Sequence, residues 1–238
     1  MPVFVITGAN RGLGLGYVHE LSHDSENLIF ALTRKPEAAA ELRNIAAEGP
    51  AKIHIVTCDV SNADSIALLP ETIQGLLPTG VLINTVINNA AVLQDSHLNS
   101  TTLTEESLSK HLTANVLGPA RTMAALMPLL AENAVVANIT SGLGSNQMLF
   151  DERITAQNIP YSLSKAALNM LTVHQAKELK GRAVVVALDP GHAKTTMGGE
   201  AATMEVTTSN RAVLQTLRQL EEMDSGRFLL YDGTVLPW

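Results

Sequence analysis

The chain has 238 residues, of which 46% are hydrophobic and 16% are charged, so it can bury the core of one α/β domain and is not typical of a disordered protein. Its net charge of −7 argues against a general nucleic-acid surface, and its single cysteine excludes an internal disulfide and indicates a reducing, cytoplasmic compartment. No apolar run reaches the roughly 18 residues of a membrane span, and we expect neither a membrane partner nor a secretory signal.

Short apolar segments alternate with helical patterns along the whole chain. The segments predicted to be strands are 3–7, 28–33, 53–58, 81–87, 134–139, 183–188 and 228–231. Helical patterns cover 13–21, 36–47, 61–69, 105–130 and 161–179. Ser61 is expected to cap the third of these helices, and Gly118-Pro119 to disturb the fourth. The alternation predicts a single domain over residues 1–238, a doubly wound Rossmann-type fold with a parallel seven-stranded sheet and helices on both faces.

Two segments lack a regular pattern, 142–160 and 191–207, and each follows the end of a predicted strand. In an open α/β sheet, ligands bind outside the carboxyl ends of the strands. We therefore expect both segments to border the functional site.

A glycine-rich loop follows the first predicted strand and opens the first helix. Its residues expected to contact a nucleotide are Gly8, Asn10, Arg11, Gly12, Leu13 and Gly14. Glycines let the backbone turn tightly and approach a pyrophosphate, and the helix N-terminus adds free N–H groups and a partial positive charge. Glycines also mark ordinary turns, but the strand–turn–helix context favours a nucleotide.

A tyrosine and a lysine are predicted to lie on one face of a helix. Tyr161 and Lys165 are four residues apart, which is about one helical turn. A nearby ammonium favours the phenolate, so we expect it to lower the tyrosine pKa from about 10 and to ready the hydroxyl for proton exchange with a substrate. Taken alone, such a pair is more often an ordinary half-exposed helix face.

The glycine spacing, three residues and then one, resembles that of the short-chain dehydrogenase/reductase family. The resemblance extends over the whole chain, because further family motifs fall on the expected elements in the expected order: Asn88-Asn89-Ala90-Ala91, Asn115, Asn138-Ile139-Thr140-Ser141, Tyr161-x-x-x-Lys165, Pro190-Gly191 and Thr195. Three segments, 138–145, 189–199 and 225–238, most resemble the C-factor-like and sniffer-like carbonyl reductases.

The resemblance implies a role for each catalytic residue. Tyr161 would be the proton donor or acceptor, Lys165 would bind the nicotinamide ribose, and Ser141 would orient the substrate oxygen. Asn115 would hold a water that connects Lys165 to solvent. Thr140 is an alternative to Ser141, but the family pattern places the catalytic hydroxyl second in the pair.

The resemblance also implies where the cofactor binds. Asp59 and Val60 would contact the adenine, with a helix-entry turn as the alternative for Asp59, and Thr195 would hold the nicotinamide amide. Ala91 and Ala193 stand where the family commonly has a glycine and a larger β-branched residue. Besides the glycine loop, Tyr161 and Lys165, the expected contacts are Arg34, Asp59, Val60, Asn89, Ala90, Ala91, Pro190, Gly191, Ala193 and Thr195.

Two cations predict which nicotinamide cofactor is bound. The second strand is followed by Arg34 and has no acid before Glu37, whereas a protein that selects NAD usually places an acid at this strand end. Arg34 would attract a 2′-phosphate, and Arg11 would reach the same phosphate from the other side. We therefore expect NADP(H); the alternative is that both arginines are solvated surface residues.

An apolar run lies between Ser141 and Tyr161. Met148 and Phe150 in this run are expected to cover a hydrophobic substrate, with His192 beside it. The alternatives are a loop that packs only on its own protein and a subunit contact. No metal site is expected, because the histidines and the cysteine lack ligand spacing.

Together these features predict an NADPH-dependent reductase of a ketone or aldehyde, whose partner is a small-molecule carbonyl or alcohol. One alternative is a redox-neutral or isomerising enzyme on the same scaffold, and another is a non-catalytic NADP-sensing protein. By analogy with the family, we expect a homodimer that pairs through the helices carrying Asn115 and Tyr161.

Overall fold

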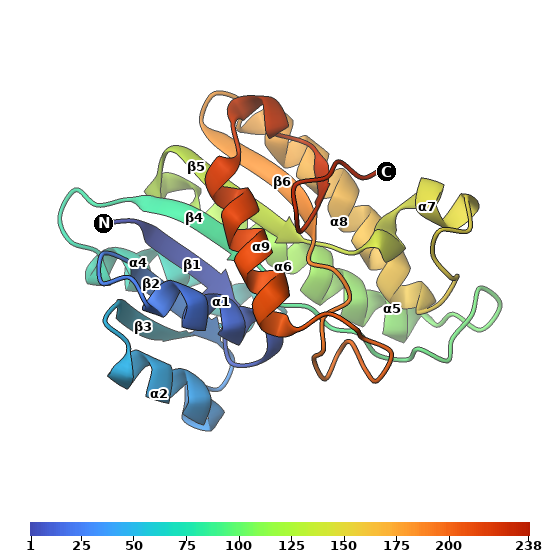
Figure 1. The fold of residues 1–238 in the computed structure, drawn as a ribbon, viewed down its shortest axis with the longest axis horizontal. Coiled ribbons are helices and arrows are strands. Elements are labelled where there is room, and N and C mark those ends of the chain that lie inside the picture. Colours follow the sequence, from blue (N-terminus) through green and yellow to red (C-terminus); the bar gives the residue numbers. More distant parts are fainter.

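The computed structural model describes residues 1–238. Seven parallel strands form one twisted sheet in the order β3-β2-β1-β4-β5-β6-β7 (Figure 1). In register, Val5 lies beside Phe30 of one neighbouring strand and Val86 of the other. The strands are β1 (Val3–Thr7), β2 (Leu28–Thr33), β3 (Lys52–Thr57), β4 (Ile83–Asn88), β5 (Leu130–Ile139), β6 (Ala183–Asp189) and β7 (Phe228–Leu230).

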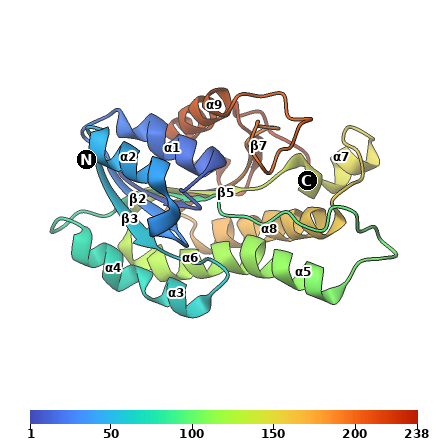
Figure 2. The same ribbon diagram turned by 90° about the horizontal axis from the view of Figure 1, so that it is seen from below.

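Helices cover both faces of the sheet. Figure 2 shows α1, α2 and α9 on one face and α3, α4, α5, α6 and α8 on the other, which confirms the predicted doubly wound architecture. The short helix α7 lies beyond the sheet, near the C-terminal residues. The helices are α1 (Gly12–Ser22), α2 (Ala40–Glu48), α3 (Ala63–Ala67), α4 (Leu69–Leu76), α5 (Glu105–Leu112), α6 (Gly118–Leu126), α7 (Asn146–Phe150), α8 (Ile159–Glu178) and α9 (Val206–Gln219).

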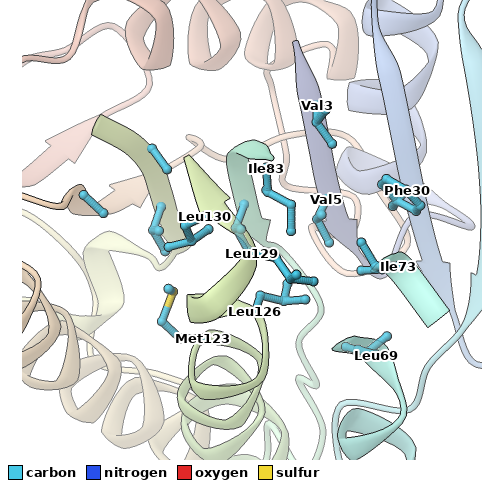
Figure 3. Packing of buried hydrophobic residues seen from close by; sticks show 14 of the residues in the cluster. Val3, Val5, Phe30, Leu69, Ile73, Ile83, Met123, Leu126, Leu129 and Leu130 are labelled. Atoms are coloured by element: carbon cyan, nitrogen blue, oxygen red, sulfur yellow. The ribbon is translucent and has the colours of Figure 1, made fainter. Parts of the chain in front are cut away.

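Each face of the sheet has its own hydrophobic core. Alternate residues of β1 point to opposite sides: Val3 and Val5 join the core under α4 and α6, shown in Figure 3, whereas Phe4 and Ile6 join the core under α1 and α9. Because both faces are covered, β1, β2 and β6 are almost continuously apolar, as expected for a buried parallel sheet. No helix combines the length and the apolarity that crossing a membrane requires.

The predicted helix over 105–130 is interrupted in its middle, as expected from Gly118-Pro119, but its predicted end is wrong. It divides into α5, a π-helical turn (Thr113–Leu117), α6 and a 3-10 turn (Met127–Leu129), and residue 130 already belongs to β5. Pro119 lies at the start of α6, directly after the π turn, and the chain is helical on both sides of this boundary. Because proline lacks an N–H and its ring clashes with the preceding turn, the irregularity falls in the residues just before it. The π turn contains Asn115, and such turns are frequent at functional sites.

The expected helix cap at Ser61 is also wrong. Asn62 caps α3, because its side-chain oxygen accepts hydrogen bonds from the backbone N–H groups of Asp64 and Ser65 at 2.8 and 3.1 Å. The Ser61 N–H instead donates to the Asp59 carboxylate at 2.9 Å, which agrees with the helix-entry turn considered for Asp59. Asn is at least as good an N-cap as Ser, so the choice depends on where the turn places the chain.

Candidate active site

A cavity of about 300 Å³ lies along the carboxyl ends of the strands. Its walls come from the segments that follow β3, β2, β1, β4, β5 and β6, which are consecutive neighbours in the sheet. Strand β1 lies between β2 and β4. The strand order therefore reverses beside β1: β2 and β3 follow on one side of it, and β4 to β7 on the other. Ligands of open α/β sheets bind at this kind of crevice.

Most of the predicted cofactor residues line this cavity. They are Gly8, Asn10, Arg11, Gly12, Leu13, Arg34, Asp59, Val60, Asn89, Ala90, Ala91, Tyr161, Lys165, Pro190 and Thr195. Gly14, Gly191 and Ala193, and also Asn115 and Ser141, do not contribute to its walls. The walls further include residues outside the predicted cofactor set: Thr33, Lys35, Ala38, Cys58, Ser61, Val92, Ala114, Ile139, Thr140, Thr196 and Met197.

The glycine loop has the close packing that a nucleotide site needs. Gly8 has a φ of +67°, a region that side chains disfavour. A Cβ atom on Gly14 would lie 2.3 Å from the Gly8 carbonyl oxygen, so Gly14 allows α1 to begin directly against the loop. The backbone N–H groups at the start of α1 therefore lie beside the cavity, and the chain fits a bound dinucleotide.

Three cations lie together on the cavity wall. Arg11, Arg34 and Lys35 are exposed, and none of them forms a salt bridge within the chain. Lys35 follows Arg34 directly, so the sequence did contain the signal for the third cation. Unpaired cations that share one wall in a protein of net charge −7 indicate a site for an anion.

Polar contacts fix α8, the helix of Tyr161 and Lys165, onto β5. The fully buried Asn138 donates to Thr172 at 2.9 Å and to Gln175 at 2.8 Å. Closer to the site, the Thr140 hydroxyl donates a hydrogen bond to the Asn169 side chain at 2.7 Å. Buried hydrogen bonds of this kind are costly to leave unmade, so they specify one position of α8 along the strand.

Tyr161 and Lys165 occupy the same helix face at the cavity wall. Their exposed fractions are 8% and 2%, and the Lys165 Nζ atom lies 5.4 Å from the centre of the Tyr161 ring. Nζ also donates to the Ile139 carbonyl at 2.7 Å. The structure thus brings together the pair that the sequence predicts.

The electrostatics of this pair differ from the sequence-based expectation. Burial raises the pKa of Tyr161, and the negative charge of Asp189 raises it further, so the net shift in the protein alone is upward and not downward as expected. Burial lowers the pKa of Lys165 to about 7, although Asp189 opposes the change. The expectation failed because it counted the ammonium but not the desolvation of both groups. Tyr161 consequently keeps its proton at neutral pH, which is the form an acid needs.

Asn115 connects three parts of the site through its side chain. Its amide nitrogen donates to the Val92 carbonyl at 3.0 Å and to the Ser164 hydroxyl at 2.9 Å, and its oxygen accepts from the Val92 N–H at 2.8 Å. These bonds join the π turn, the segment after β4 and α8. With its side chain occupied by protein groups and 1% exposed, Asn115 holds the site together, and its water-binding role stays a prediction.

The two candidate hydroxyls after β5 have different partners. The Thr140 hydroxyl is buried and donates to Asn169. The Ser141 oxygen only accepts a hydrogen bond, from the Leu143 N–H at 3.2 Å, so its proton has no acceptor within the chain. Thr140 lines the cavity and Ser141 does not. Hydrogen bonding nevertheless favours Ser141, because a hydroxyl must have a free proton to bind a substrate oxygen.

The three predicted substrate residues do not come together at the cavity. Phe150 is 84% exposed on α7, and none of Met148, Phe150 and His192 lines the cavity. Met148 lies close to the loop after β5, because a Cβ atom on Gly142 would lie 3.3 Å from its Cε atom. The His192 ring is hydrogen-bonded to the Gly198 carbonyl at 2.8 Å. Met197, which does line the cavity, was missed because no motif marks it.

Comparison with known proteins agrees with this geometry. The family model of the short chain dehydrogenases matches residues 2–206. An uncharacterized oxidoreductase of Schizosaccharomyces pombe is 30% identical over 99% of this chain and 98% of its own length, and C-signal of Myxococcus xanthus is 38% identical over 55% of this chain and 78% of its own length. The chain therefore belongs to the short-chain dehydrogenase family, and it is an oxidoreductase.

Solved structures are similar over the full chain. A carbonyl reductase from chicken fatty liver, with NADPH bound, and the carbonyl reductase Sniffer of D. melanogaster are each 33% identical, with a TM-score of 0.91 and complete coverage of both chains. These matches confirm the Rossmann-type fold.

Proposed function

We propose that this protein reduces the carbonyl group of a ketone or an aldehyde to an alcohol with NADPH, with Tyr161 as the acid. One observation carries the proposal: a single cavity has both the three cations and the buried Tyr161–Lys165 pair in its wall. An anionic cofactor and a proton donor therefore have places at the same crevice. Two similar structures, named as carbonyl reductases, support this reaction class.

The residues of the chain then divide the work. When bound, NADPH would supply the hydride that the carbonyl carbon receives. Tyr161 holds the proton at its hydroxyl and gives it to the carbonyl oxygen. The free Ser141 proton makes a second hydrogen bond to that oxygen and orients it. Lys165, while charged, stabilises the phenolate that remains on Tyr161.

NADP(H) is the cofactor that the charges favour. Arg11, Arg34 and Lys35 are free of internal salt bridges and can bind a 2′-phosphate, and Arg can do so through two hydrogen bonds at once. No acidic residue lies at the end of β2, where an acid would repel that phosphate.

A turnover assay tests the proposed reaction. The purified protein is incubated with NADPH and a panel of aromatic and aliphatic ketones, aldehydes and quinones, and the loss of NADPH absorbance is followed. We expect turnover with at least one carbonyl compound. Isomerised substrate without NADPH loss would indicate a redox-neutral enzyme, and tight NADPH binding without any conversion would indicate a sensing protein.

The reduction rate is expected to fall as the pH rises through about 7. Lys165 has a pKa of about 7, so it is charged below this pH and neutral above it. Only the charged form stabilises the phenolate, whereas the raised pKa of Tyr161 keeps its proton in place over the same range. A pH profile of kcat with NADPH checks this. A rate that rises as the pH increases above about 7 would contradict the assignment.

The hydrophobic lid stays a prediction. Of its two predicted residues, Met148 is better placed than Phe150 to contact a substrate. Met148 packs on the cluster of Ala187, Phe228 and Leu236, and it lies close to Gly142, the residue after Ser141. We expect Met148→Ala to raise KM for a hydrophobic ketone by roughly tenfold, by the loss of buried apolar contact. Phe150→Ala is the matched control and should change KM little. Equal KM values for the wild type, Met148→Ala and Phe150→Ala would contradict the proposal that Met148 covers the substrate.

A homodimer is also part of the proposal. Leu117, Leu163 and Met170 are large exposed apolar side chains of the π turn and α8, and pairing of two copies would cover them. Analytical ultracentrifugation of the wild type and of Met170→Glu at equal concentration tests this. We expect the wild type to sediment as a dimer and Met170→Glu to dissociate more readily. The cytoplasmic location stays a prediction from the single cysteine.

A further inference from the structure

Asp189 joins two loops of the candidate site through one carboxylate. It is the last residue of β6 and directly precedes Pro190-Gly191. One carboxylate oxygen accepts the Gly142 N–H at 2.7 Å, and the other accepts the Gly191 N–H at 2.9 Å. The loop after β5 and the loop after β6 are therefore tied to each other across the carboxyl edge of the sheet.

Both glycines that donate to the Asp189 carboxylate lie close in the chain to residues of the candidate site. Gly142 directly follows Ser141, and Gly191 begins the loop that carries Thr195 to the cavity. An ionised aspartate is an acceptor only and matches two N–H donors, whereas an asparagine would turn its own N–H₂ toward one of them. Only a carboxylate of this length therefore satisfies both loops.

The charges that face Asp189 come from two elements. Lys165 of α8 lies near it, because the Lys165 Nζ atom donates to the Ile139 carbonyl, and Ile139 pairs with Leu188, the residue before Asp189. Burial raises the pKa of Asp189, whereas the Gly191 and Gly142 N–H groups and the charges of Lys165 and His192 favour its carboxylate form. Tyr161 of α8 is the other ionisable group on which the Asp189 charge acts. The loop after β5 carries no ionisable side chain between residues 141 and 150. Asp189 is the one acidic group that acts on Lys165, and it favours the charged amine against the effect of burial.

We propose that Asp189 is a positioning residue of the site, whose carboxylate fixes Ser141 relative to the Gly191 loop and supplies the negative charge that faces the Lys165 amine. The effect of Asp189 on turnover rests on the proposed function. The effect of its charge on Lys165 does not, because it can be measured in the protein without substrate or cofactor.

The electrostatic part is tested without substrate or cofactor. The protein is labelled with ¹³C-lysine, the Lys165 signal is assigned by its loss in Lys165→Arg, and its titration is followed by NMR. Asp189→Asn is expected to move the Lys165 midpoint to lower pH by about one unit. Asp232→Asn is the matched control, because Asp232 is exposed and also accepts a backbone N–H two residues ahead. An unchanged midpoint in a folded Asp189→Asn protein would overturn the charge role.

The positioning part is tested by kinetics. We expect Asp189→Asn to lower kcat about tenfold to a hundredfold through displacement of Ser141, to leave KM for NADPH nearly unchanged, and to move the fall of the pH profile to lower pH. Asp189→Glu keeps the charge but is too long for both bonds, so its Lys165 midpoint should stay near that of the wild type while kcat stays low. Full kcat in either variant would overturn the positioning role.

Two further controls keep the outcomes separable. If Asp189→Asn does not give a cooperative thermal transition, Asp189→Glu alone decides the positioning role by its kcat. If Tyr161→Phe is as active as the wild type, the proposed function fails, while the NMR midpoints still decide whether Asp189 acts on Lys165.

Discussion

Replacing Tyr161 with phenylalanine is expected to lower kcat for carbonyl reduction about a thousandfold, within the range of general acid catalysis. The change keeps the buried ring and removes only the hydroxyl that holds the transferred proton. Because the phenol does not carry the cofactor's charge contacts, the Kd for NADPH should change by less than about threefold, which is under 1 kcal/mol. Stopped-flow turnover and NADPH fluorescence titration measure the two quantities.

A second buried tyrosine provides a matched control. Tyr17 in α1 is also completely buried, and its hydroxyl has no hydrogen-bond partner within the chain. Tyr17→Phe makes the same chemical change in the core under α1 and α9, away from the cavity, so it should leave kcat unchanged and should not destabilise the fold. Loss of activity in both variants, or a common loss of turnover and NADPH binding in Tyr161→Phe, would speak against the acid role.

Reversing the charge at Arg34 is expected to change the cofactor preference. Arg34→Asp removes charge-assisted hydrogen bonds to the 2′-phosphate and adds repulsion, so kcat/KM with NADPH should fall roughly a hundredfold, or about 3 kcal/mol. With NADH, which lacks this phosphate, kcat/KM should change by less than about threefold. The measurement is a pair of kcat/KM values for each protein.

Arg218 is the control for the charge reversal. It lies exposed in the last turn of α9 and does not line the cavity, so Arg218→Asp changes the net charge equally but away from the cation group. Its two kcat/KM values should match those of the wild type. If Arg34→Asp lowered both values equally, Arg34 would serve the fold or the pyrophosphate region and not the 2′-phosphate.

Local patterns predicted the sheet well. The apolar runs predicted as strands over 3–7 and 28–33 have the same bounds as β1 and β2 in the structure. The order of the motifs, each at a strand end, then brought the glycine loop, Asn89, Tyr161 and Pro190 to one cavity. Periodicity and chain order were sufficient for these features because parallel strands all present their carboxyl ends at one edge.

Long-range contacts account for what the sequence did not show. The π turn at Asn115 depends on bonds to Val92 and Ser164, which lie far from it in the chain. The raised pKa of Tyr161 depends on burial and on Asp189, and no motif marks Asp189. Phe150 appeared suited to a lid by composition, but α7 turns it toward solvent. Local patterns do not report which residues the tertiary structure brings together.

The most direct test of the account is to follow the hydride itself. NADPH labelled with deuterium at the transferring position is incubated with an accepted ketone and the protein, and the product is analysed by mass spectrometry. We predict an alcohol with deuterium on the former carbonyl carbon, formed by the wild type and nearly absent with Tyr161→Phe. Product without deuterium, or isomerised substrate with the labelled NADPH intact, would contradict the proposal of carbonyl reduction.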